Sequence, residues 1–131
     1  MDRARIAAVP LFAGLAGDDL DRLADAATEV DLEAGAPLTA EGEFGHALYI
    51  VESGTANVER DGAVIGSIGP GDVVGEIAVL SSGRRTATVV ATSAMSLIAI
   101  FKRDVWVLER NAPAVAERLR ELLTHRLDGP S

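Results

Sequence analysis

The sequence predicts a mainly β domain of the α+β class, with a body of short strands between helical ends. Most of the 13 glycines fall between Thr28 and Phe101, where they divide the chain into short segments rich in Val, Ile and Thr. On either side of this body, apolar residues recur at helical spacing. Many short strands without long helices between them are typical of a β-sandwich, jelly roll or barrel.

The N-terminal part, residues 1–27, is expected to be helical. Asp18 can cap a helix whose apolar residues follow the i, i+3, i+4, i+7 pattern. These apolar residues are Leu20, Leu23, Ala24 and Ala27. Before this helix, residues 9–12 form a short apolar segment that is broken by Pro10 and is expected to pack on the body.

The body, residues 28–101, carries the predicted strands. The first three predicted strands cover residues 47–53, 55–60 and 63–68. Asp61 and Gly62, between the last two, are a strong signal for a two-residue hairpin turn. Residues 85–91 and 94–100 are rich in Thr, Val and Ile, and are expected to form another β pair.

The C-terminal part, residues 102–131, is expected to form two helices. The first covers residues 102–110, and Asn111 and Pro113 mark the break before the second, at about residues 113–127. The apolar face of the second helix is Val115, Leu119, Leu122 and Leu123. One further turn brings Arg126 to the end of this face, where a charged side chain commonly snorkels to solvent. The whole chain, 1–131, is expected to be a single domain.

Composition excludes several function classes. Apolar residues make up 48% of the 131 residues, which is enough for a packed core. The net charge is −8, which argues against a surface for a nucleic acid polymer or an anionic membrane. No apolar run is long enough to span a membrane. Residues 6–16 imitate a signal peptide, but Pro10 and Gly14 interrupt them, so a cytoplasmic protein is expected.

Residues for metal binding and catalysis are scarce. The chain has no cysteine, so disulfides, thiolate metal sites and cysteine nucleophiles are excluded. His46 and His125 are the two histidines, and His46 is expected in a surface loop rather than in a metal site. Neither histidine belongs to a recognisable nucleophile–base motif. An enzyme, a metal site and a cofactor are therefore not expected.

Residues 75–89 carry the strongest chemical signal. Gly75 leads into a very short helical turn, whose free backbone N–H groups favour an anion. Arg85 and Thr86 return from the next strand and can add charge-assisted and hydroxyl hydrogen bonds to a phosphate. Glu76 would repel a phosphate but suits a sugar hydroxyl. Anion donors beside a hydroxyl acceptor predict a site for a ribose phosphate.

This segment resembles the phosphate-binding cassette of the cyclic nucleotide-binding domain family. The match lies in Gly-Glu-Ile-Ala at 75–78 followed by Arg-Thr-Ala-Thr at 85–88, and the resemblance covers nearly the whole chain. From Gly75 onward the chain is most similar to cyclic nucleotide-gated channels of the hyperpolarisation-activated type, which share Gly-Arg-Arg-Thr-Ala. The fold implied is an eight-stranded antiparallel, jelly-roll-like β-roll with N-terminal helices, a short cassette helix and two C-terminal helices.

The resemblance also implies a role for each site residue. Ligand phosphate contacts would be Arg85, Thr86 and the backbone N–H groups of Ile77 and Ala78. Ribose contacts would be Glu76 and Gly75. Base contacts would be Val58, Ile68, Val74 and Arg126, the last closing over the base. The family commonly has an aromatic residue where Val74 stands, and proline where Arg84 stands.

The expected function is a sensing module for cAMP. The resemblance implies that cGMP is also possible, because a threonine at the position of Thr86 in this family can bond a guanine amino group. The cyclic nucleotide is the ligand, and an unidentified effector protein or domain is the expected partner. One alternative is an interaction domain that keeps the fold but does not use the ligand site. Another is a transcription factor of the cAMP-receptor type, which would need a helix-turn-helix that this acidic sequence does not contain.

Overall fold

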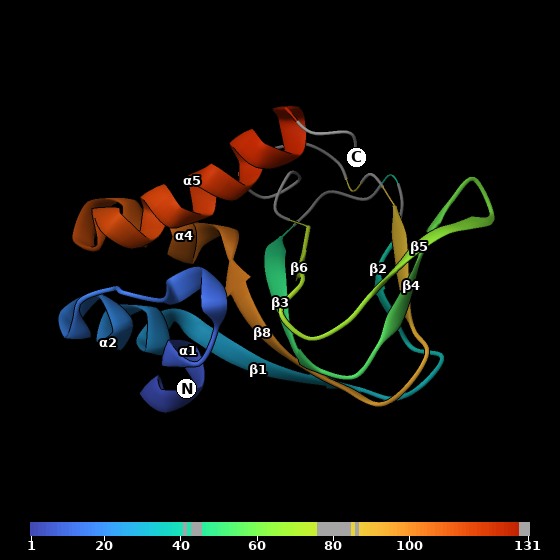
Figure 1. Cartoon of the computed structure of the whole chain (residues 1–131), viewed down its shortest axis with the longest axis horizontal. Helices are drawn as coiled ribbons and strands as arrows, with labels where there is room; N and C mark the ends of the chain where they lie inside the picture. Colours follow the sequence, from blue (N-terminus) through green and yellow to red (C-terminus); the bar gives the residue numbers. More distant parts are fainter. Residues whose placement is uncertain (41, 43–45, 76–84, 86, 129–131) are drawn as a thin grey trace.

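The computed structural model describes residues 1–40, 42, 46–75, 85 and 87–128, with the backbone alone for residues 122–128. In these residues two four-stranded sheets lie beside a group of helices (Figure 1). The strands are β1 (Ala27–Leu32), β2 (Pro37–Thr39), β3 (Ala47–Ser53), β4 (Ala56–Arg60), β5 (Ala63–Ile68), β6 (Val73–Val74), β7 (Thr88–Ala91) and β8 (Met95–Phe101). The helices are α1 (Arg3–Ala7), the 3₁₀ helix η1 (Pro10–Phe12), α2 (Gly17–Ala26), α4 (Lys102–Asn111) and α5 (Pro113–Asp128).

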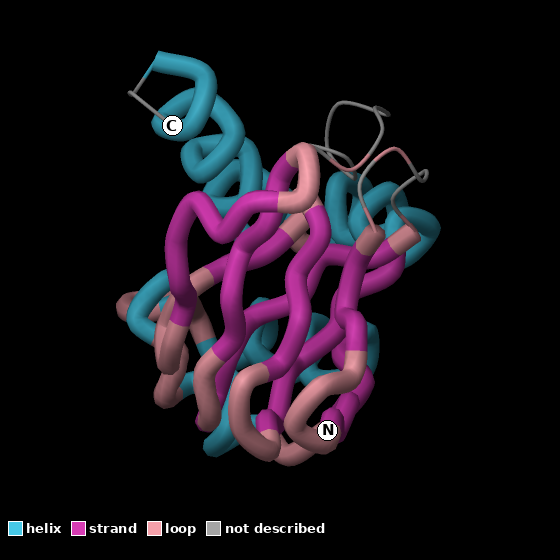
Figure 2. The backbone as a smooth tube through the Cα atoms, turned by 90° about the vertical axis from the view of Figure 1, so that its right-hand side faces the viewer, coloured by secondary structure: helices cyan, strands magenta, loops and turns pink. Residues whose placement is uncertain are grey.

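The two sheets confirm the predicted β-roll. The first has the strand order β1-β8-β3-β6 and the second β2-β7-β4-β5, and neighbouring strands are antiparallel. Figure 2 looks from the side of the second sheet and shows its strands in front of the helices. The helices therefore pack against the first sheet, and the second sheet closes the other side of the roll.

One predicted strand pair is wrong. We expected residues 85–91 and 94–100 to pair with each other, but β7 lies in the second sheet and β8 in the first. The short link between them crosses from one sheet to the other and is fixed by Thr55, whose carbonyl accepts from the Thr92 N–H and whose N–H donates to the Ser93 hydroxyl. A short link is typical of a hairpin, but it also suffices for a strand that changes sheets.

The β4–β5 hairpin forms where the sequence predicts it. Asp61 and Gly62 both have positive φ angles, 53° and 80°, as a two-residue turn of type I′ requires. β5 matches its predicted bounds, and β4 starts one residue later than expected, at Ala56.

The start of α2 corrects a second prediction. Asp18 does not cap this helix, because Ala16 is the N-cap residue and no side chain bonds there. Asp18 lies inside the first turn, where its charge still suits the positive end of the helix dipole. Leu23 and Ala24 are buried as predicted, and Ala27, also buried, is the first residue of β1.

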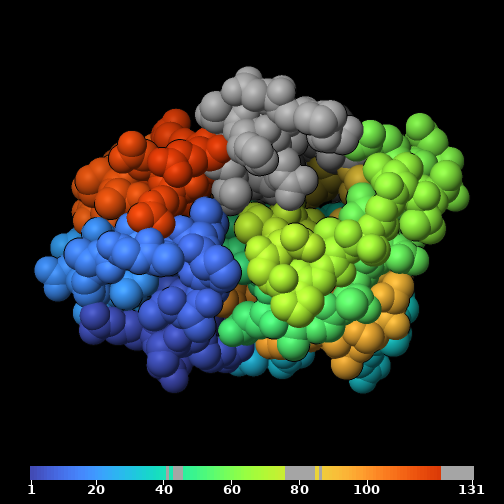
Figure 3. Space-filling model, viewed as in Figure 1, coloured from blue at the N-terminus to red at the C-terminus, as the bar shows by residue number. Residues whose placement is uncertain are grey.

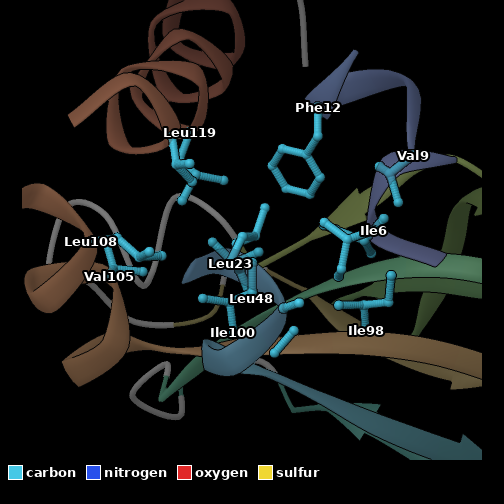
Figure 4. Close-up of a cluster of buried hydrophobic side chains, with 14 of the residues drawn as sticks. Ile6, Val9, Phe12, Leu23, Leu48, Ile98, Ile100, Val105, Leu108 and Leu119 are labelled. Atoms are coloured by element: carbon cyan, nitrogen blue, oxygen red, sulfur yellow. The ribbon is translucent and has the colours of Figure 1, made fainter. Parts of the chain in front are cut away.

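The first sheet is apolar on both faces. Alternate residues of β3 and β8 contact the helices, and Figure 4 shows this cluster, which includes Leu48, Ile98 and Ile100 together with Leu119 of α5. The residues between them, among them Val51 and Leu97, face the interior of the roll. This period-two alternation gives the sheet a helix-packed face and an interior face that is available for a site.

Arginine side chains tie the ends of the chain to this frame. Nη1 of Arg118, on α5, donates to the carbonyls of Leu11 at 2.9 Å and Ala13 at 2.8 Å. Arg5 of α1 pairs with Glu52 and Glu29, and the hydrogen bond to Glu52 is the main reason why the pKa of Arg5 is raised. The N-terminal and C-terminal helices therefore form one continuous body beside the roll (Figure 3).

Candidate functional site

Arg85 is buried at one end of the roll, with 8% of its surface exposed. Its Nη2 donates to the Ala47 carbonyl at 2.7 Å, and its Nη1 donates to the Gly75 carbonyl at 3.3 Å. The guanidinium therefore links the first residue of β3 to the residue that follows β6. Because both carbonyls fix its plane, Arg85 is held ready for the directional hydrogen bonds that guanidinium groups make to phosphates.

Gly75 is required by the position of Arg85. Its φ angle is +83°, a conformation that residues with a Cβ rarely adopt. A Cβ at this position would overlap Nη1 of Arg85, and would lie 3.0 Å from its Cζ and 3.3 Å from the Ala47 carbonyl oxygen. The sequence predicted that Gly75 permits a close approach, and the structure shows that the group that approaches is Arg85.

Tyr49 is a site residue that the sequence analysis missed. The Cζ atom of Arg85 lies 5.8 Å from the centroid of the Tyr49 ring, within the range of a cation–π contact. Tyr49 pairs with Val74 across β3 and β6, so the two side chains are neighbours on the interior face. The available signal was alternation, because Tyr49 stands between Leu48 and Ile50, which both face the helices.

The structure brings the three described residues predicted for the base into one apolar cluster. Val58 comes from β4, Ile68 from β5 and Val74 from β6, so they approach from both sheets. Val74 is buried, whereas Val58 and Ile68 are partly buried. An apolar surface between the sheets therefore lies next to the cationic end that Arg85 provides, although the contact of these residues with a base stays a prediction.

Several predicted contacts lie outside the described residues. These are Glu76, Ile77, Ala78 and Thr86, together with the predicted short cassette helix. Arg126 lies on α5, whose backbone is described there, but its side chain is not among the described parts. Gly75 and Arg85 are thus the described residues at the two ends of the cassette.

Two further findings concern the described part of the chain. No helix there is both long enough and apolar enough to cross a membrane. Within the same residues, no group of three or more His, Asp or Glu side chains could hold a metal ion.

Comparison with known proteins decides the family. The model of the cyclic nucleotide-binding domain family matches residues 29–111, well over half of the chain. The chain belongs to the cyclic nucleotide-binding domain family. This confirms the resemblance inferred from residues 75–78 and 85–88.

The relatives of this cyclic nucleotide-binding domain include receptors, channels and kinase subunits. The cyclic AMP receptor protein of Thermus thermophilus is 35% identical over 123 residues, covering 90% of this chain and 57% of that protein. A cyclic nucleotide-gated potassium channel of Rhizobium etli is 31% identical over 125 residues, covering 95% of this chain and 35% of the channel. The chain therefore spans less than two thirds of these relatives.

A solved structure shares the fold closely. It is the regulatory subunit of a cAMP-independent protein kinase A from Trypanosoma brucei, which is 27% identical with a TM-score of 0.81. The match covers 97% of this chain and 44% of that one.

Proposed function

We propose that this chain is a sensing module that binds cAMP, and also tolerates cGMP, between its two sheets. The observation that carries the proposal is Arg85, a buried guanidinium fixed by two carbonyls beside an apolar cluster. Membership of the cyclic nucleotide-binding domain family supports the same ligand class. A binding rather than a catalytic role is supported by the relatives, which are a receptor protein and a channel.

The cyclic phosphate would bind at Arg85. In this proposal Thr86 and the backbone N–H groups of Ile77 and Ala78 complete the phosphate site, while Glu76 and Gly75 hold the ribose. The described geometry supports the arrangement because the guanidinium stands at the end of β6, where the cassette begins. A cyclic phosphate carries one negative charge, and hydrogen bonds to such a charge are stronger than those between neutral groups.

The purine would lie on the apolar cluster. Val58, Ile68 and Val74 present aliphatic surface from both sheets, and burying a flat base against it is favourable. Tyr49 lies between this surface and Arg85, so it borders both parts of the proposed ligand. Val74 is smaller than the aromatic residue common in the family, which leaves more room for either purine.

The response would be closure of α5 over the base, with Arg126 as the closing contact. A ligand shifts such an equilibrium only by the contacts that it makes in the closed state and not in the open one. In the structure α5 packs on α4, α2 and η1. The proposed closure would bring its C-terminal end, where Arg126 lies, toward the base. In this proposal all 131 residues act as one binding domain, and an effector protein or domain reads the position of α5.

An interaction domain that ignores the nucleotide is the alternative. One observation supports this alternative: the regulatory subunit from Trypanosoma brucei shares this fold and belongs to a cAMP-independent kinase. The fold therefore does not by itself guarantee a response to cAMP, and a direct binding measurement separates the two functions.

Calorimetric titration with cAMP and cGMP tests the proposal. We expect saturable binding to the wild type and a loss of affinity of about tenfold or more in Arg85→Ala, because a hydrogen bond to a charged group contributes about 1.5–3 kcal/mol. Arg5→Ala is the matched control. It also removes an arginine held by polar partners, but on the helix-packed face of the same sheet, and should leave the affinity unchanged.

Circular dichroism of each variant confirms that the fold persists. Binding that survives Arg85→Ala with less than about a twofold loss would contradict the proposed phosphate site. An absence of heat and of thermal stabilisation with both nucleotides would favour the interaction domain.

A further inference from the structure

A hollow of about 450 Å³ lies where β8 runs into α4. We call it the α4 hollow. Its lining residues are His46, Phe101, Lys102, Arg103 and Trp106. The only tryptophan of the chain, Trp106, is 58% exposed, and Phe101 is 36% exposed. Exposed apolar side chains that gather in one patch, rather than singly, are typical of interaction surfaces.

The chemistry of the α4 hollow is cationic as well as aromatic. Lys102 and Arg103 contribute two positive charges to its lining. Among the described residues, neither Lys102 nor Arg103 forms an ion pair. These charges stand on a chain whose net charge is −8. The α4 hollow is therefore a local basic surface on an acidic protein.

We infer that the α4 hollow docks an acidic segment of a partner protein, with an apolar side chain against Trp106 and carboxylates on Lys102 and Arg103. Tryptophan and arginine are the residue types most enriched at the energetic centres of protein interfaces. A second copy fits poorly, because a two-fold contact would place the same cations face to face. A nucleic acid polymer fits poorly because the whole chain repels it.

Backbone hydrogen bonds connect the residues of the α4 hollow to the proposed phosphate site. The Lys102 N–H donates to the His46 carbonyl at 2.9 Å. The carbonyl of the next residue, Ala47, accepts from Arg85 at 2.7 Å. Two consecutive residues thus connect α4 to the guanidinium, and a ligand that draws Arg85 toward itself acts on both. This coupling rests on the proposed function, whereas the docking surface does not.

Fluorescence anisotropy tests the docking surface. The probe is a short fluorescein-labelled peptide in which Asp and Glu alternate with Leu and Phe, and the control peptide has Lys in place of Asp and Glu. We expect the acidic peptide to bind the full chain saturably and the basic one not to bind. Arg103→Glu and Trp106→Ala should each weaken binding by about tenfold or more. Arg22→Glu, the same charge change at an exposed arginine of α2, should change it less than about twofold.

Three outcomes would overturn the inference: no saturable binding of the acidic peptide, equal binding of the basic peptide, or an equal loss in Arg22→Glu. Sedimentation adds a fourth, because self-association that Arg103→Glu abolishes would assign the α4 hollow to a second copy. A separate titration of the same chain with cAMP as the ligand distinguishes this inference from the proposed function. Peptide binding without cAMP binding leaves the docking surface standing, and cAMP binding without peptide binding leaves the sensor standing.

Coupling predicts that cAMP changes the peptide affinity by about twofold or more in the wild type and not in Arg85→Ala. An unchanged affinity in the wild type at saturating cAMP would overturn the coupling.

Discussion

Two backbone carbonyls and an aromatic ring are among the contacts that hold Arg85. The carbonyls belong to Ala47 and Gly75, so of these three contacts the ring of Tyr49 is the one that a side-chain substitution can remove. Substitutions of Tyr49 and of Gly75 therefore test separately how the ring and the space beside it position Arg85.

Tyr49 is predicted to strengthen ligand binding through Arg85. Tyr49→Leu removes the ring 5.8 Å from the guanidinium, and cation–π contacts of this kind contribute about 0.5–2 kcal/mol. We expect Tyr49→Leu to lower the affinity for cAMP by about threefold or more, as measured by calorimetric titration. Tyr49→Phe retains the ring and should bind like the wild type. Equal losses in both variants would show that the hydroxyl, and not the ring face, is responsible.

Gly75→Ala is predicted to abolish cAMP binding because the new Cβ would overlap Nη1 of Arg85. Gly71→Ala is the matched control, since Gly71 has φ +92° but nothing within 4 Å of its Cβ position. Both substitutions should lower the free energy of unfolding by about 1–2 kcal/mol through backbone strain. Only Gly75→Ala should lose the ligand, as measured by titration beside urea unfolding. A comparable affinity loss in Gly71→Ala would attribute the effect to strain alone.

At the scale of elements, α5 is tied to the N-terminal segment by Arg118. Its guanidinium donates to the carbonyls of Leu11 and Ala13, 107 and 105 residues away in sequence. Arg120, on the same helix, instead pairs with Glu109 at the surface. Both arginines lie on α5, but Arg118 connects segments that are far apart in sequence, whereas Arg120 pairs with a residue of the neighbouring helix α4.

Arg118→Met should therefore destabilise the protein more than Arg120→Met. We expect a loss of about 1–2 kcal/mol in the free energy of unfolding for Arg118→Met, since a charged donor is lost and Arg118 is only partly buried. Arg120→Met should cost about 1 kcal/mol or less, as for exposed ion pairs. Urea unfolding followed by Trp106 fluorescence measures both. Equal losses would show that the Arg118 hydrogen bonds do not hold α5 in place.

The elements also show where sequence reasoning succeeds. β3 and the β4–β5 hairpin were predictable because a single residue pattern decides each of them: a short continuous apolar run for β3, and Asp61-Gly62 for the turn. The pairing of β7 was not predictable, because the link to β8 is equally short for a hairpin and for a change of sheet. The start of α2 was misplaced by two residues because an acidic residue suits both the cap and the first turn.

Only some residues of the candidate site could be predicted from the sequence. Arg85 and Gly75 could be singled out because their residue types are rare in a strand and tied to phosphate chemistry. Alternation along β3 could place Tyr49 on the interior face, but its contact with Arg85 could not be predicted, because it joins residues 36 positions apart (85 − 49). The cluster of Val58, Ile68 and Val74 was named from family resemblance, since three aliphatic strand residues have no distinguishing pattern of their own.

For the whole molecule, one sheet serves both stability and ligand binding. Its helix-packed face holds Ile98 and Ile100, fully buried, while its interior face holds Tyr49 and Val74. A ligand on the interior face would bind the folded chain and not the unfolded one. Saturating it at 100 times Kd is therefore expected to raise the free energy of unfolding by about 2.7 kcal/mol.

Urea unfolding with and without cAMP measures this linkage. Arg85→Ala, at the same nucleotide concentration, should show little of the increase, and 5′-AMP should serve as the non-cyclic control. A shift that is the same in Arg85→Ala and the wild type would place the stabilising nucleotide elsewhere on the molecule.

A crystal structure of the chain in complex with cAMP most directly tests the central claim, that Arg85 binds the cyclic phosphate. The account predicts phosphate oxygens about 2.7–2.9 Å from the guanidinium nitrogens of Arg85, with the adenine on the surface formed by Val58, Ile68 and Val74. A nucleotide bound at any other place, with the Arg85 guanidinium still bonded to the Gly75 and Ala47 carbonyls and not to phosphate, would contradict it.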